Sequence, residues 1–580
     1  MLKNSFKTLF AVAVLIFTAF SCTTKDGIYK VEIYALNDVH GKFFDSLYVE
    51  GKANSHSLAN VSEYLKNRRS QIGSDAVAMV DLGDALQGDN SVFYANYIDT
   101  ATAQKHLFTR VAEYLGYDAM VVGNHDIEAG HPVYDKIMAE TQIPYLAANA
   151  IDIKSGNSYF KPYAIFEKNG LEIAVIGMTN PNIKKWLGEE LWSGMEFLPI
   201  DALADSLVEE VHSKYSPDIV ILAIHAGLGD GTSEDIENPA RYLAANTKGI
   251  DILFSSHDHQ TACEKIWNGK DSVLLMEGGS RVKYLIKVDA ALKFNKGELV
   301  SKSFDGQLLP MDSIAVDKDY VNNFRADYLK TKSFTNQEIG ILNNDINTTD
   351  AFFGPSAYIN LIHSVQLAQS GADISMAAPL TYNGHIDAGK LIYHDLFTIY
   401  PFENQLYVLK LTGKQILDCL EYSYDTWINT MTSQSDHLMR IKFDSKRGNY
   451  SFVFPAYNFD SAAGIIYDVD VREPFGKRVK IKSMSDGTKF DLERTYSVAM
   501  SSYRANGGGD LLTKGAGIPK EQLPAIITNK MDDIRGMIFD FYRSGQQSNK
   551  MISAQWKFVP EPFVASAAKR DRALLFGESR

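Results

Sequence analysis

Five short apolar runs in this chain end directly in His, Asp or Asn. Runs of this kind, bounded by polar residues, are typical of buried β-strands. In an open α/β sheet the carboxyl ends of the strands converge on one edge, where ligand sites are built. The residues that follow the runs are therefore expected to meet. In chain order, these residues are Asp38 and His40 after run 31–36, Asp84 after 76–82, Asn124 and His125 after 119–122, His225 after 219–224, and His257 and His259 after 250–254.

The spacing and chemistry of these residues indicate a metal centre. Asp38 and His40 are two residues apart, as are His257 and His259, so each pair points to one face of an extended backbone. Mixed imidazole and carboxylate ligands suit divalent Zn, Mn, Fe or Co better than Ca or Mg. Two such ions, about 3.5–4 Å apart, need a bridging ligand such as a carboxylate. Each segment alone is also typical of a turn; their joint occurrence favours the metal interpretation.

The length and pattern of the chain predict two domains. The 580 residues exceed the ~250–300 residues at which a single core stops growing. Over residues 28–316, apolar runs alternate with amphipathic stretches such as 57–69 and 201–214, which predicts a layered α/β domain. The charged segment 317–332 lacks Gly and Pro, so we expect a linker helix that acts as a hinge. Residues 333–565 mix helical and hairpin-like stretches and predict a smaller α+β domain.

The net charge of −13 and the pI near 5.5 argue against binding to a nucleic-acid polymer, because such proteins carry basic faces. An acidic protein that handles phosphate must supply positive charge locally, and metal ions do so. Beyond residue 22, Cys263 and Cys419 lie far apart in different predicted domains, so we expect two buried free thiols and no disulfide framework. We expect a monomer.

The N-terminus is typical of an export signal. Lys3 and Lys7 precede an apolar run over residues 9–20, which is shorter than the ~18–20 residues that span a bilayer. Ser21, Cys22 and the polar residues that follow favour a lipoprotein-type signal over residues 1–22, with a lipid anchor on Cys22. Cleavage without an anchor is the alternative. The predicted location is the periplasm or the outer membrane and cell surface, with membrane contact through the anchor alone.

These motifs resemble the calcineurin-like metallophosphoesterases, and more closely the bacterial 5′-nucleotidase and 2′,3′-cyclic-nucleotide 2′-phosphodiesterase family. The resemblance implies a four-layer α/β/β/α sandwich followed by a nucleotidase C-terminal domain. It also implies two-metal hydrolysis, with His125 as an imidazolium at the phosphate, oriented by Glu128 where the family usually has Asp. Ser256 stands where Gly is usual. By motif, one metal takes Asp38, His40, bridging Asp84 and His259, and the other takes Asp84, Asn124, His225 and His257.

The C-terminal half carries its own resemblance to this family. The segments 401–404 and 502–510 match those that present two aromatic faces to a nucleotide base. The resemblance implies that Phe402 and Tyr503 sandwich the base, with Asn404 and Asp510 as further substrate-binding residues. Stacking on aromatic rings contributes about 1–3 kcal/mol per base. Viewed singly, both aromatics are also typical of core residues.

Two further observations bear on the choice of ester. Residues 378–385 contain no Arg, whereas the 5′-nucleotidase branch carries a phosphate-binding Arg there. Residues 377–379, 457–460 and 503–505 resemble the cyclic-phosphodiesterase branch. We therefore expect a 2′,3′-cyclic-nucleotide 2′-phosphodiesterase/3′-nucleotidase. The alternatives are a 5′-nucleotidase or nucleotide-sugar hydrolase, a non-catalytic nucleotide-binding lipoprotein, and a phosphoesterase acting on proteins or lipids.

Overall fold

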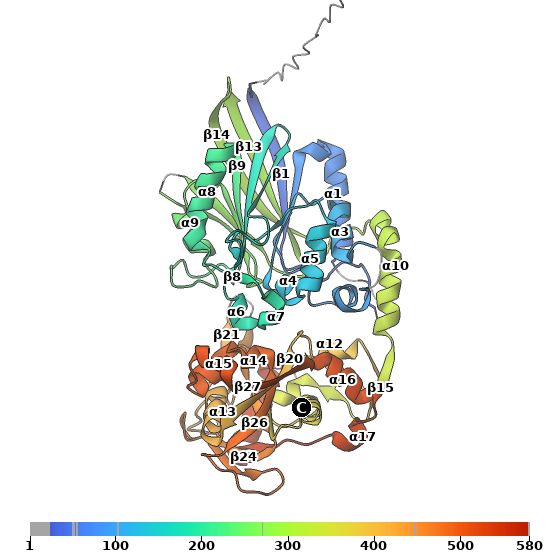
Figure 1. The fold of residues 1–580 in the computed structure, drawn as a ribbon, viewed down its shortest axis with the longest axis vertical. Coiled ribbons are helices and arrows are strands. Elements are labelled where there is room, and N and C mark those ends of the chain that lie inside the picture. Colours follow the sequence, from blue (N-terminus) through green and yellow to red (C-terminus); the bar gives the residue numbers. More distant parts are fainter. Residues whose placement is uncertain are drawn as a thin grey trace, which may run out of the picture.

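The computed structural model has two lobes stacked along its long axis (Figure 1). The N-terminal lobe holds β1 to α10, and the C-terminal lobe holds β15 to α18. The predicted signal over residues 1–22 and the anchor site Cys22 lie outside the described residues. No helix in the described part is long and apolar enough to cross a bilayer. The structure describes residues 24–48, 53, 56–100, 104–269, 271–445 and 448–577.

Two six-stranded sheets form the centre of the N-terminal lobe. Most of their inner strands pair in parallel; the second sheet has antiparallel strands at both edges, and the first sheet at one edge only. The first sheet has the order β14 (Glu298–Pro310), β13 (Tyr284–Asn295), β1 (Gly27–Leu36), β2 (Val77–Asp81), β3 (Ala119–Val121) and β4 (Tyr145–Leu146). The second has the order β11 (Thr261–Trp267), β12 (Ser272–Gly278), β10 (Ile252–Phe254), β9 (Ile219–His225), β7 (Leu171–Thr179) and β6 (Tyr163–Lys168).

Side-chain alternation along the strands explains the layers. On β1, Val31, Ile33 and Ala35 face the second sheet, whereas Tyr34 and Leu36 face the helices. Both faces are buried, so the strands are continuously apolar. The layers are therefore helix, sheet, sheet, helix, which confirms the predicted α/β/β/α fold. One helical layer contains α1 (Leu58–Ile72), α3 (Leu107–Leu115) and α5 (His131–Glu140); the other contains α8 (Asp201–Tyr215) and α9 (Ala240–Asn246).

Short elements surround the open edge of this sandwich. They are the helices α2 (Asn90–Phe93), α4 (Asn124–Glu128), α6 (Ile183–Trp186) and α7 (Glu189–Trp192), the π-helical turn η2 (Tyr94–Ile98), and the strand pair β5 (Ala150–Asp152) and β8 (Met195–Phe197). In Figure 1, α4, α6 and α7 lie at the end of the lobe that faces the C-terminal lobe. The strand ends that carry the predicted ligands lie at this same end of the N-terminal lobe.

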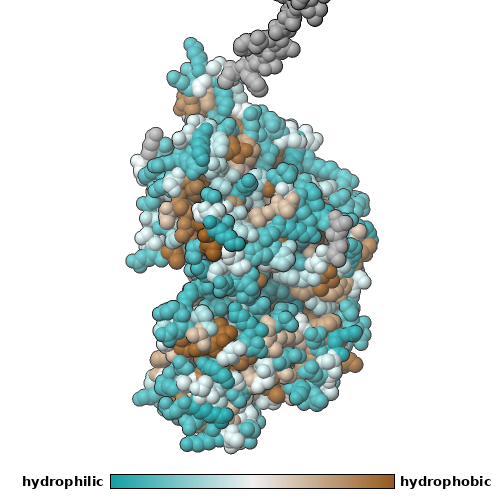
Figure 2. Space-filling model, in the orientation of Figure 1, coloured by the Kyte–Doolittle hydropathy of each residue, from teal (hydrophilic) through white to brown (hydrophobic). Residues whose placement is uncertain are grey.

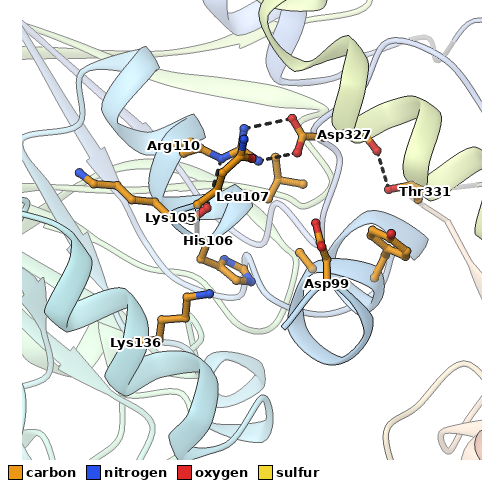
Figure 3. A pocket seen from close by; sticks show the side chains of 11 residues that line it. Asp99, Lys105, His106, Leu107, Arg110, Lys136, Asp327 and Thr331 are labelled. Carbon is orange, nitrogen blue, oxygen red and sulfur yellow. Dashed lines mark hydrogen bonds and ion pairs between the residues drawn. The ribbon is translucent and has the colours of Figure 1, made fainter. Parts of the chain in front are cut away.

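The helix that follows the sandwich, α10 (Lys318–Thr335), matches the linker helix predicted over residues 317–332. Asp317 caps it and also accepts a hydrogen bond from Ser62 Oγ at 2.7 Å. Tyr320 is fully buried in the helical layer of the N-terminal lobe, and Arg110 of α3 pairs with both carboxylate oxygens of Asp327 (Figure 3). These contacts fix the first part of α10 on the N-terminal lobe, whereas Phe334 near its end contacts Tyr393 of the C-terminal lobe, with 4.2 Å between the ring centroids. A hinge within 317–332 stays a prediction.

The C-terminal lobe is a mixed α+β fold. Its main sheet has the order β23 (Ser461–Ala463), β17 (Ile374–Ala377), β26 (Thr495–Ser501), β20 (Gln405–Thr412) and β27 (Ile527–Asp533), and a smaller sheet has the order β25 (Val479–Met484), β24 (Ile465–Asp470) and β28 (Gln555–Val559). The strand pairs are β15 (Glu338–Leu342) with β19 (Gly389–Ile392), β16 (Ile346–Asn347) with β18 (His385–Ile386), and β21 (Ile441–Asp444) with β22 (Asn449–Phe452). The helices are α11 (Ala357–Ser370), α12 (Asp395–Ile399), α13 (Gly413–Trp427), α14 (Ser502–Ala505), α15 (Leu523–Ile526), α16 (Ile534–Arg543), α17 (Gln547–Lys550) and α18 (Glu561–Phe576).

The two cysteines of the described part behave differently. Cys419 on α13 is a buried free thiol, as expected. Cys263 is exposed, so the prediction of a second buried thiol is wrong. The reason is its place on β11, an edge strand whose residues alternate between the sheet interior and solvent. Cys263 falls on the solvent side, next to buried Ala262.

Candidate functional site

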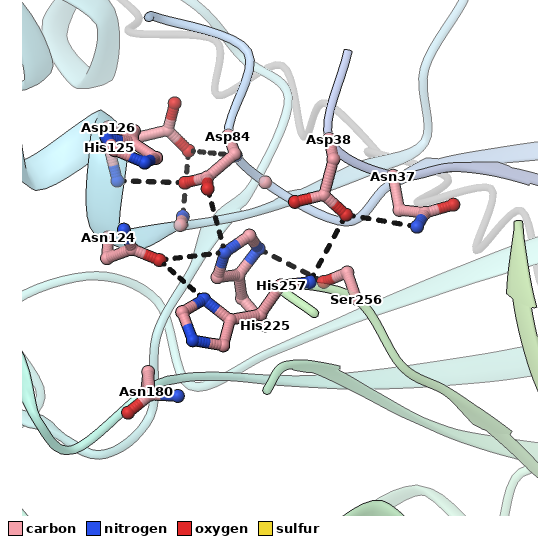
Figure 4. A network of polar contacts seen from close by, with 12 residues as sticks. Asn37, Asp38, Asp84, Asn124, His125, Asp126, Asn180, His225, Ser256 and His257 are labelled. Carbon is pink, nitrogen blue, oxygen red and sulfur yellow. Dashed lines mark hydrogen bonds and ion pairs between the residues drawn. The ribbon is translucent and has the colours of Figure 1, made fainter. Parts of the chain in front are cut away.

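All seven predicted metal ligands lie at the carboxyl ends of strands at one edge of the sandwich. Figure 4 shows five of them: Asp38, Asp84, Asn124, His225 and His257. Ligand atoms of Asp38, His40 and His259 lie within 4.8 Å of one another, and so do those of Asp38, Asp84 and His225. The two groups share Asp38, so they form one continuous cluster. The sources are the turn after β1 for Asp38 and His40, the turn after β2 for Asp84, the start of α4 for Asn124, the end of β9 for His225, and the loop after β10 for His257 and His259.

The backbone of this cluster is strained. A non-glycine residue in the left-handed region costs of order 1–3 kcal/mol and persists where the surrounding structure fixes it. Such residues concentrate at active sites and ligand clamps. Five of the seven predicted ligands are in this region: Asp38 (φ 50°), His40 (φ 46°), Asp84 (φ 57°), His257 (φ 84°) and His259 (φ 58°).

In the first group, the ring nitrogens of two histidines face each other. The Nδ1–H of His40 donates to the Gln87 carbonyl at 3.1 Å, which leaves the unprotonated Nε2 3.1 Å from Nε2 of His259. Asp38 Oδ1 is buried, has no hydrogen-bond partner among the described residues, and lies 3.4 Å from the same His259 nitrogen. These acceptor atoms converge on one point, so the residues fit a cation.

The second group repeats this arrangement. The Nδ1–H of His225 donates to the Leu82 carbonyl at 2.8 Å, so its Nε2 faces Asp84 Oδ2 and Asn124 Oδ1, each at 3.1 Å. Nδ1 of His257 lies 2.9 Å from the same Asn124 oxygen. Metal-binding histidines usually have the far ring nitrogen fixed by a hydrogen bond in this way. The chemistry of this group therefore also fits a first-row divalent ion.

Asp84 occupies the centre of the cluster. Its Oδ1 accepts the backbone N–H of His125 at 2.8 Å, while Oδ2 faces His225. Burial opposes its ionisation, but the charges of His225 and His125 outweigh burial and hold the pKa of Asp84 well below its usual range. Gly123 has to be glycine because a Cβ there would stand 2.1 Å from Asp84 Oδ1. This carboxylate is thus ionised and closely enclosed.

Beside the cluster, His125 contacts Glu128. Nδ1 of His125 hydrogen-bonds Glu128 Oε2, and the His125 ring packs edge-on against His40 at 5.5 Å. Burial disfavours the charged ring, but the carboxylates of Asp84 and Glu128 raise the pKa of His125 to about 9. The geometry places Glu128 where an orienting carboxylate is expected, even though it is Glu and not Asp.

Sequence reasoning did not give Asp126 a role. The buried carboxylate of Asp126 accepts four backbone N–H groups from the two loops that carry Asp84 and Asn124. It therefore fixes these loops and does not contact His125. The donors are Gly123 at 2.8 Å, Asp84 at 3.0 Å, and Ala85 and Leu86 at 3.1 Å each.

Two further residues beside His257 had no signal in the sequence. Glu237 Oε1 lies 3.5 Å from His257 Nε2, and the Trp186 ring stacks on the His257 imidazole at 5.3 Å. Both lie in loops or short helices far from any strand end, so no strand pattern points to them. Ser256, which stands where glycine was expected, is buried and donates its hydroxyl to the Leu82 and Ile224 carbonyls at 3.0 and 3.2 Å.

A cavity of about 740 Å³ lies between the two lobes and joins the metal cluster to the C-terminal lobe. The space-filling view shows a notch at this level (Figure 2). All four predicted substrate-binding residues line the cavity. From the N-terminal lobe its wall includes Asp84, Asn124, His125, Glu128, His257 and His259; from the C-terminal lobe it includes Phe402, Asn404, Tyr503 and Asp510.

Three aromatic rings, and not two, surround the C-terminal part of the cavity. Tyr457 packs edge-on against Phe402 at 6.4 Å and against Tyr503 at 6.5 Å. Tyr457 also lines the cavity and is 43% exposed. The Tyr503 ring lies on Gly508, where a Cβ would stand 2.4 Å from the ring. The glycine run after Tyr503 thus makes room for an aromatic platform.

Two buried arginines hold these aromatic loops. Arg504 donates to Asn458 Oδ1 at 2.8 Å, to the Gly508 and Tyr457 carbonyls, and to Asp460. It therefore joins the Tyr457 loop to the glycine run.

Arg535 fixes the loop that presents Phe402. It donates to the carbonyls of Tyr400 and Phe402 at 2.9 and 3.3 Å and to Glu403 Oε1 at 2.7 Å. Its guanidinium also lies 5.1 Å from the ring of Phe93, which comes from the N-terminal lobe. The loop is thus anchored at the contact between the lobes.

Two family models match separate parts of the chain. The model of the calcineurin-like phosphoesterase family matches residues 31–261, and the model of the 5′-nucleotidase C-terminal domain matches residues 334–514. A Yersinia enterocolitica 2′,3′-cyclic-nucleotide 2′-phosphodiesterase/3′-nucleotidase is 23% identical, with 82% of this chain and 81% of the relative covered. A Vibrio parahaemolyticus 5′-nucleotidase is 24% identical, with 76% and 85% covered.

A longer relative and a solved structure complete the comparison. The Bacillus subtilis trifunctional nucleotide phosphoesterase protein YfkN is 24% identical over 91% of this chain, which spans 39% of that relative's length. A crystal structure described as a 5′-nucleotidase from Staphylococcus aureus superposes with a TM-score of 0.73 at 21% identity, covering 91% of this chain and 99% of that one. The chain is a metal-dependent phosphoesterase and belongs to the family that joins a calcineurin-like phosphoesterase domain to a 5′-nucleotidase C-terminal domain.

Proposed function

We propose that the protein hydrolyses phosphate esters of nucleotides, opening 2′,3′-cyclic nucleotides and then releasing phosphate from the resulting 3′-nucleotides. The observation that carries this proposal is a cavity between the lobes that is lined by the metal cluster at one end and by three aromatic rings at the other. A nucleotide has a phosphate and a flat base at its two ends, and this cavity offers a matching surface to each.

Two divalent ions of the Zn, Mn, Fe or Co type would occupy the cluster. The convergent ring nitrogens support this assignment, because imidazole ligands favour these metals over Ca and Mg. When bound, such ions activate water and offset charge on the transferring phosphoryl group. The first ion would be held by Asp38, His40, Asp84 and His259, and the second by Asp84, Asn124, His225 and His257.

The chain's own groups would do the remaining work. His125, kept protonated by Asp84 and Glu128, would donate a hydrogen bond to a phosphate oxygen or a proton to the leaving oxygen. Glu128 would hold the His125 ring in place through Nδ1. At the far end, Phe402 and Tyr503 would stack on the base, while Asn404 and Asp510 offer polar groups to its edge.

The preference for cyclic and 3′-phosphates is supported by the wall near β17. Ala377, Ala378 and Leu380 line the cavity in the segment where the 5′-nucleotidase branch has a phosphate-binding Arg. Arg504 also lines the cavity, but its donors are used by Asn458, Asp460 and backbone carbonyls. Relatives of both substrate types are similar to this chain, so a 5′-nucleotidase is the second candidate. We further propose export and attachment to a membrane through Cys22.

The test is phosphate release from a panel of 2′,3′-cyclic, 3′- and 5′-nucleotides with Mn, Zn, Co and Mg. We expect 2′,3′-cyclic AMP and 3′-AMP to be hydrolysed faster than 5′-AMP, and Mg to be a poor activator. The Asp84→Asn variant serves as the inactive control. Faster hydrolysis of 5′-AMP would favour the second candidate, and no release from any nucleotide with any ion would overturn the proposal.

A further inference from the structure

Gln87 joins the metal cluster to the loop that presents Phe402. It lies in the loop after β2, three positions beyond Asp84, and is buried. Its backbone carbonyl accepts the Nδ1–H of His40 at 3.1 Å, whereas its side-chain Nε2 donates to the Pro401 carbonyl of the C-terminal lobe at 3.3 Å. One residue therefore contacts a predicted metal ligand through its backbone and the neighbour of a predicted base-binding ring through its side chain.

The backbone around Gln87 is held against the turn that carries His40. Ser91 Oγ donates to the Gly41 carbonyl at 3.0 Å. Gly88 lies directly on the His40 side chain, since a Cβ on Gly88 would stand 3.0 Å from the His40 Cβ. The position of Gln87 relative to His40 is thus fixed by three contacts, which include the bond from Nδ1 of His40.

On its other side, Gln87 completes the hydrogen bonds of the Phe402 loop. The carbonyls of Tyr400 and Phe402 both accept from Arg535 within the C-terminal lobe, at 2.9 and 3.3 Å. The Pro401 carbonyl between them accepts from Gln87, and no other donor to this carbonyl occurs among the described residues. Of three consecutive carbonyls, the middle one is therefore held from the opposite lobe.

Two further contacts join the same segments of the two lobes. Asn90 Nδ2 lies 2.8 Å from Nδ1 of His394, and Phe93 packs edge-on against Phe397 at 5.5 Å. These contacts keep the lobes together beside the cavity. Of the three, only the bond from Gln87 reaches a residue whose two neighbours in the chain line the cavity.

We infer that Gln87 is a positioning residue that sets the distance between the metal centre and the Phe402 ring, and so favours phosphate esters that carry a base. The inference rests on the proposed function. A nucleotide spans both ends of the cavity, so its turnover depends on how well the two ends are placed relative to each other. A phosphate ester without a base uses the metal end alone and gains nothing from Gln87.

The test is the ratio of kcat/KM for 3′-AMP to kcat/KM for glycerol 2-phosphate, which has a similar secondary phosphate ester but no base. Gln87→Met keeps the length of the side chain and the carbonyl that holds His40, but removes the amide donor. We expect this variant to lower the ratio about two- to tenfold, the equivalent of one neutral hydrogen bond, with unchanged metal affinity. Gln71→Met on α1 removes an exposed amide of the same lobe and is the matched control, which should leave the ratio unchanged.

A double-mutant cycle shows whether Gln87 acts through Phe402. In a Phe402→Ala background, Gln87→Met should no longer lower the ratio, because the ring that Gln87 positions is absent. An equal loss in both backgrounds, or an equal loss for both substrates, would overturn the inference.

Hydrogen–deuterium exchange of the substrate-free protein gives a readout that needs no turnover. We expect residues 400–404 to exchange faster in Gln87→Met than in wild type, and at the wild-type rate in Gln71→Met. Wild-type exchange in Gln87→Met would reject the link between Gln87 and this loop. No phosphate release from any nucleotide by the wild-type protein would instead reject the proposed function, so the two failures are distinguishable.

Discussion

Asp126 gives the sharpest test of how the two ligand loops are held. Its buried carboxylate accepts four backbone N–H groups, two on each oxygen. Oδ2 accepts from Gly123 and Asp84, so it ties the loop after β2 to the loop after β3. The Asp126→Asn substitution preserves size but replaces one oxygen by an NH₂ group, which can only donate.

The number of lost hydrogen-bond acceptors sets the loss in free energy of unfolding. The remaining oxygen can serve two of the four N–H groups, and the other two then face a donor. Each buried N–H left without an acceptor costs about 1–3 kcal/mol, so the N-terminal lobe should lose about 2–6 kcal/mol of stability. The loops that carry Asp84 and Asn124 should also become more mobile. Loss of a group that holds metal ligands in place lowers metal affinity about 10–100-fold.

The assay is differential scanning calorimetry together with metal titration of wild type and Asp126→Asn. We expect the transition of the N-terminal lobe to move down by several degrees, at about 2–4 °C per kcal/mol for a large domain. Asp373→Asn is the matched control, because that exposed carboxylate bonds Ser497 through one oxygen, which an amide can replace. A variant with wild-type melting and metal affinity would refute the reasoning.

Three further predictions concern residues around the cavity. Glu237→Gln should weaken metal binding about tenfold, because Glu237 contacts the metal ligand His257. The effect should be no larger, since the contact is 3.5 Å long and the Glu237 side chain is 40% exposed. Unchanged affinity in a metal titration would contradict this. Phe402→Ala should raise KM for a nucleotide about five- to 150-fold, the equivalent of about 1–3 kcal/mol of stacking, with kcat nearly unchanged in steady-state kinetics. Arg535→Met leaves Glu403 buried without its partner and should destabilise the C-terminal lobe by about 3–5 kcal/mol, a loss that the added Glu403→Gln change should partly restore in urea unfolding.

The sequence predicts the layers and the strand-end residues well because both depend on local pattern. On β1, the residues alternate between two buried faces, so they form one apolar run in the sequence. A polar turn with Asp38 and His40 follows this run. Parallel strands bring such turns to one edge, so adjacency in space follows from position along each strand. The same reasoning placed Asp84, Asn124 and His225 correctly beside one another.

The residues that sequence reasoning missed act through contacts between distant segments. Glu237 reaches His257 from a loop, and Arg535 holds the Phe402 loop from a helix 133 positions away. Neither has a periodicity or motif of its own. Cys263 was placed in the core because the pattern does not reveal that β11 is an edge strand.

Anomalous diffraction from crystals grown with Mn²⁺ would show directly whether the strand-end cluster holds two metal ions. We expect two anomalous peaks, about 3.5–4 Å apart, with the Asp84 carboxylate between them and His40 and His225 on opposite sides. Crystals that diffract well but show no peak at Asp84, or peaks away from the six other predicted ligands, would contradict it.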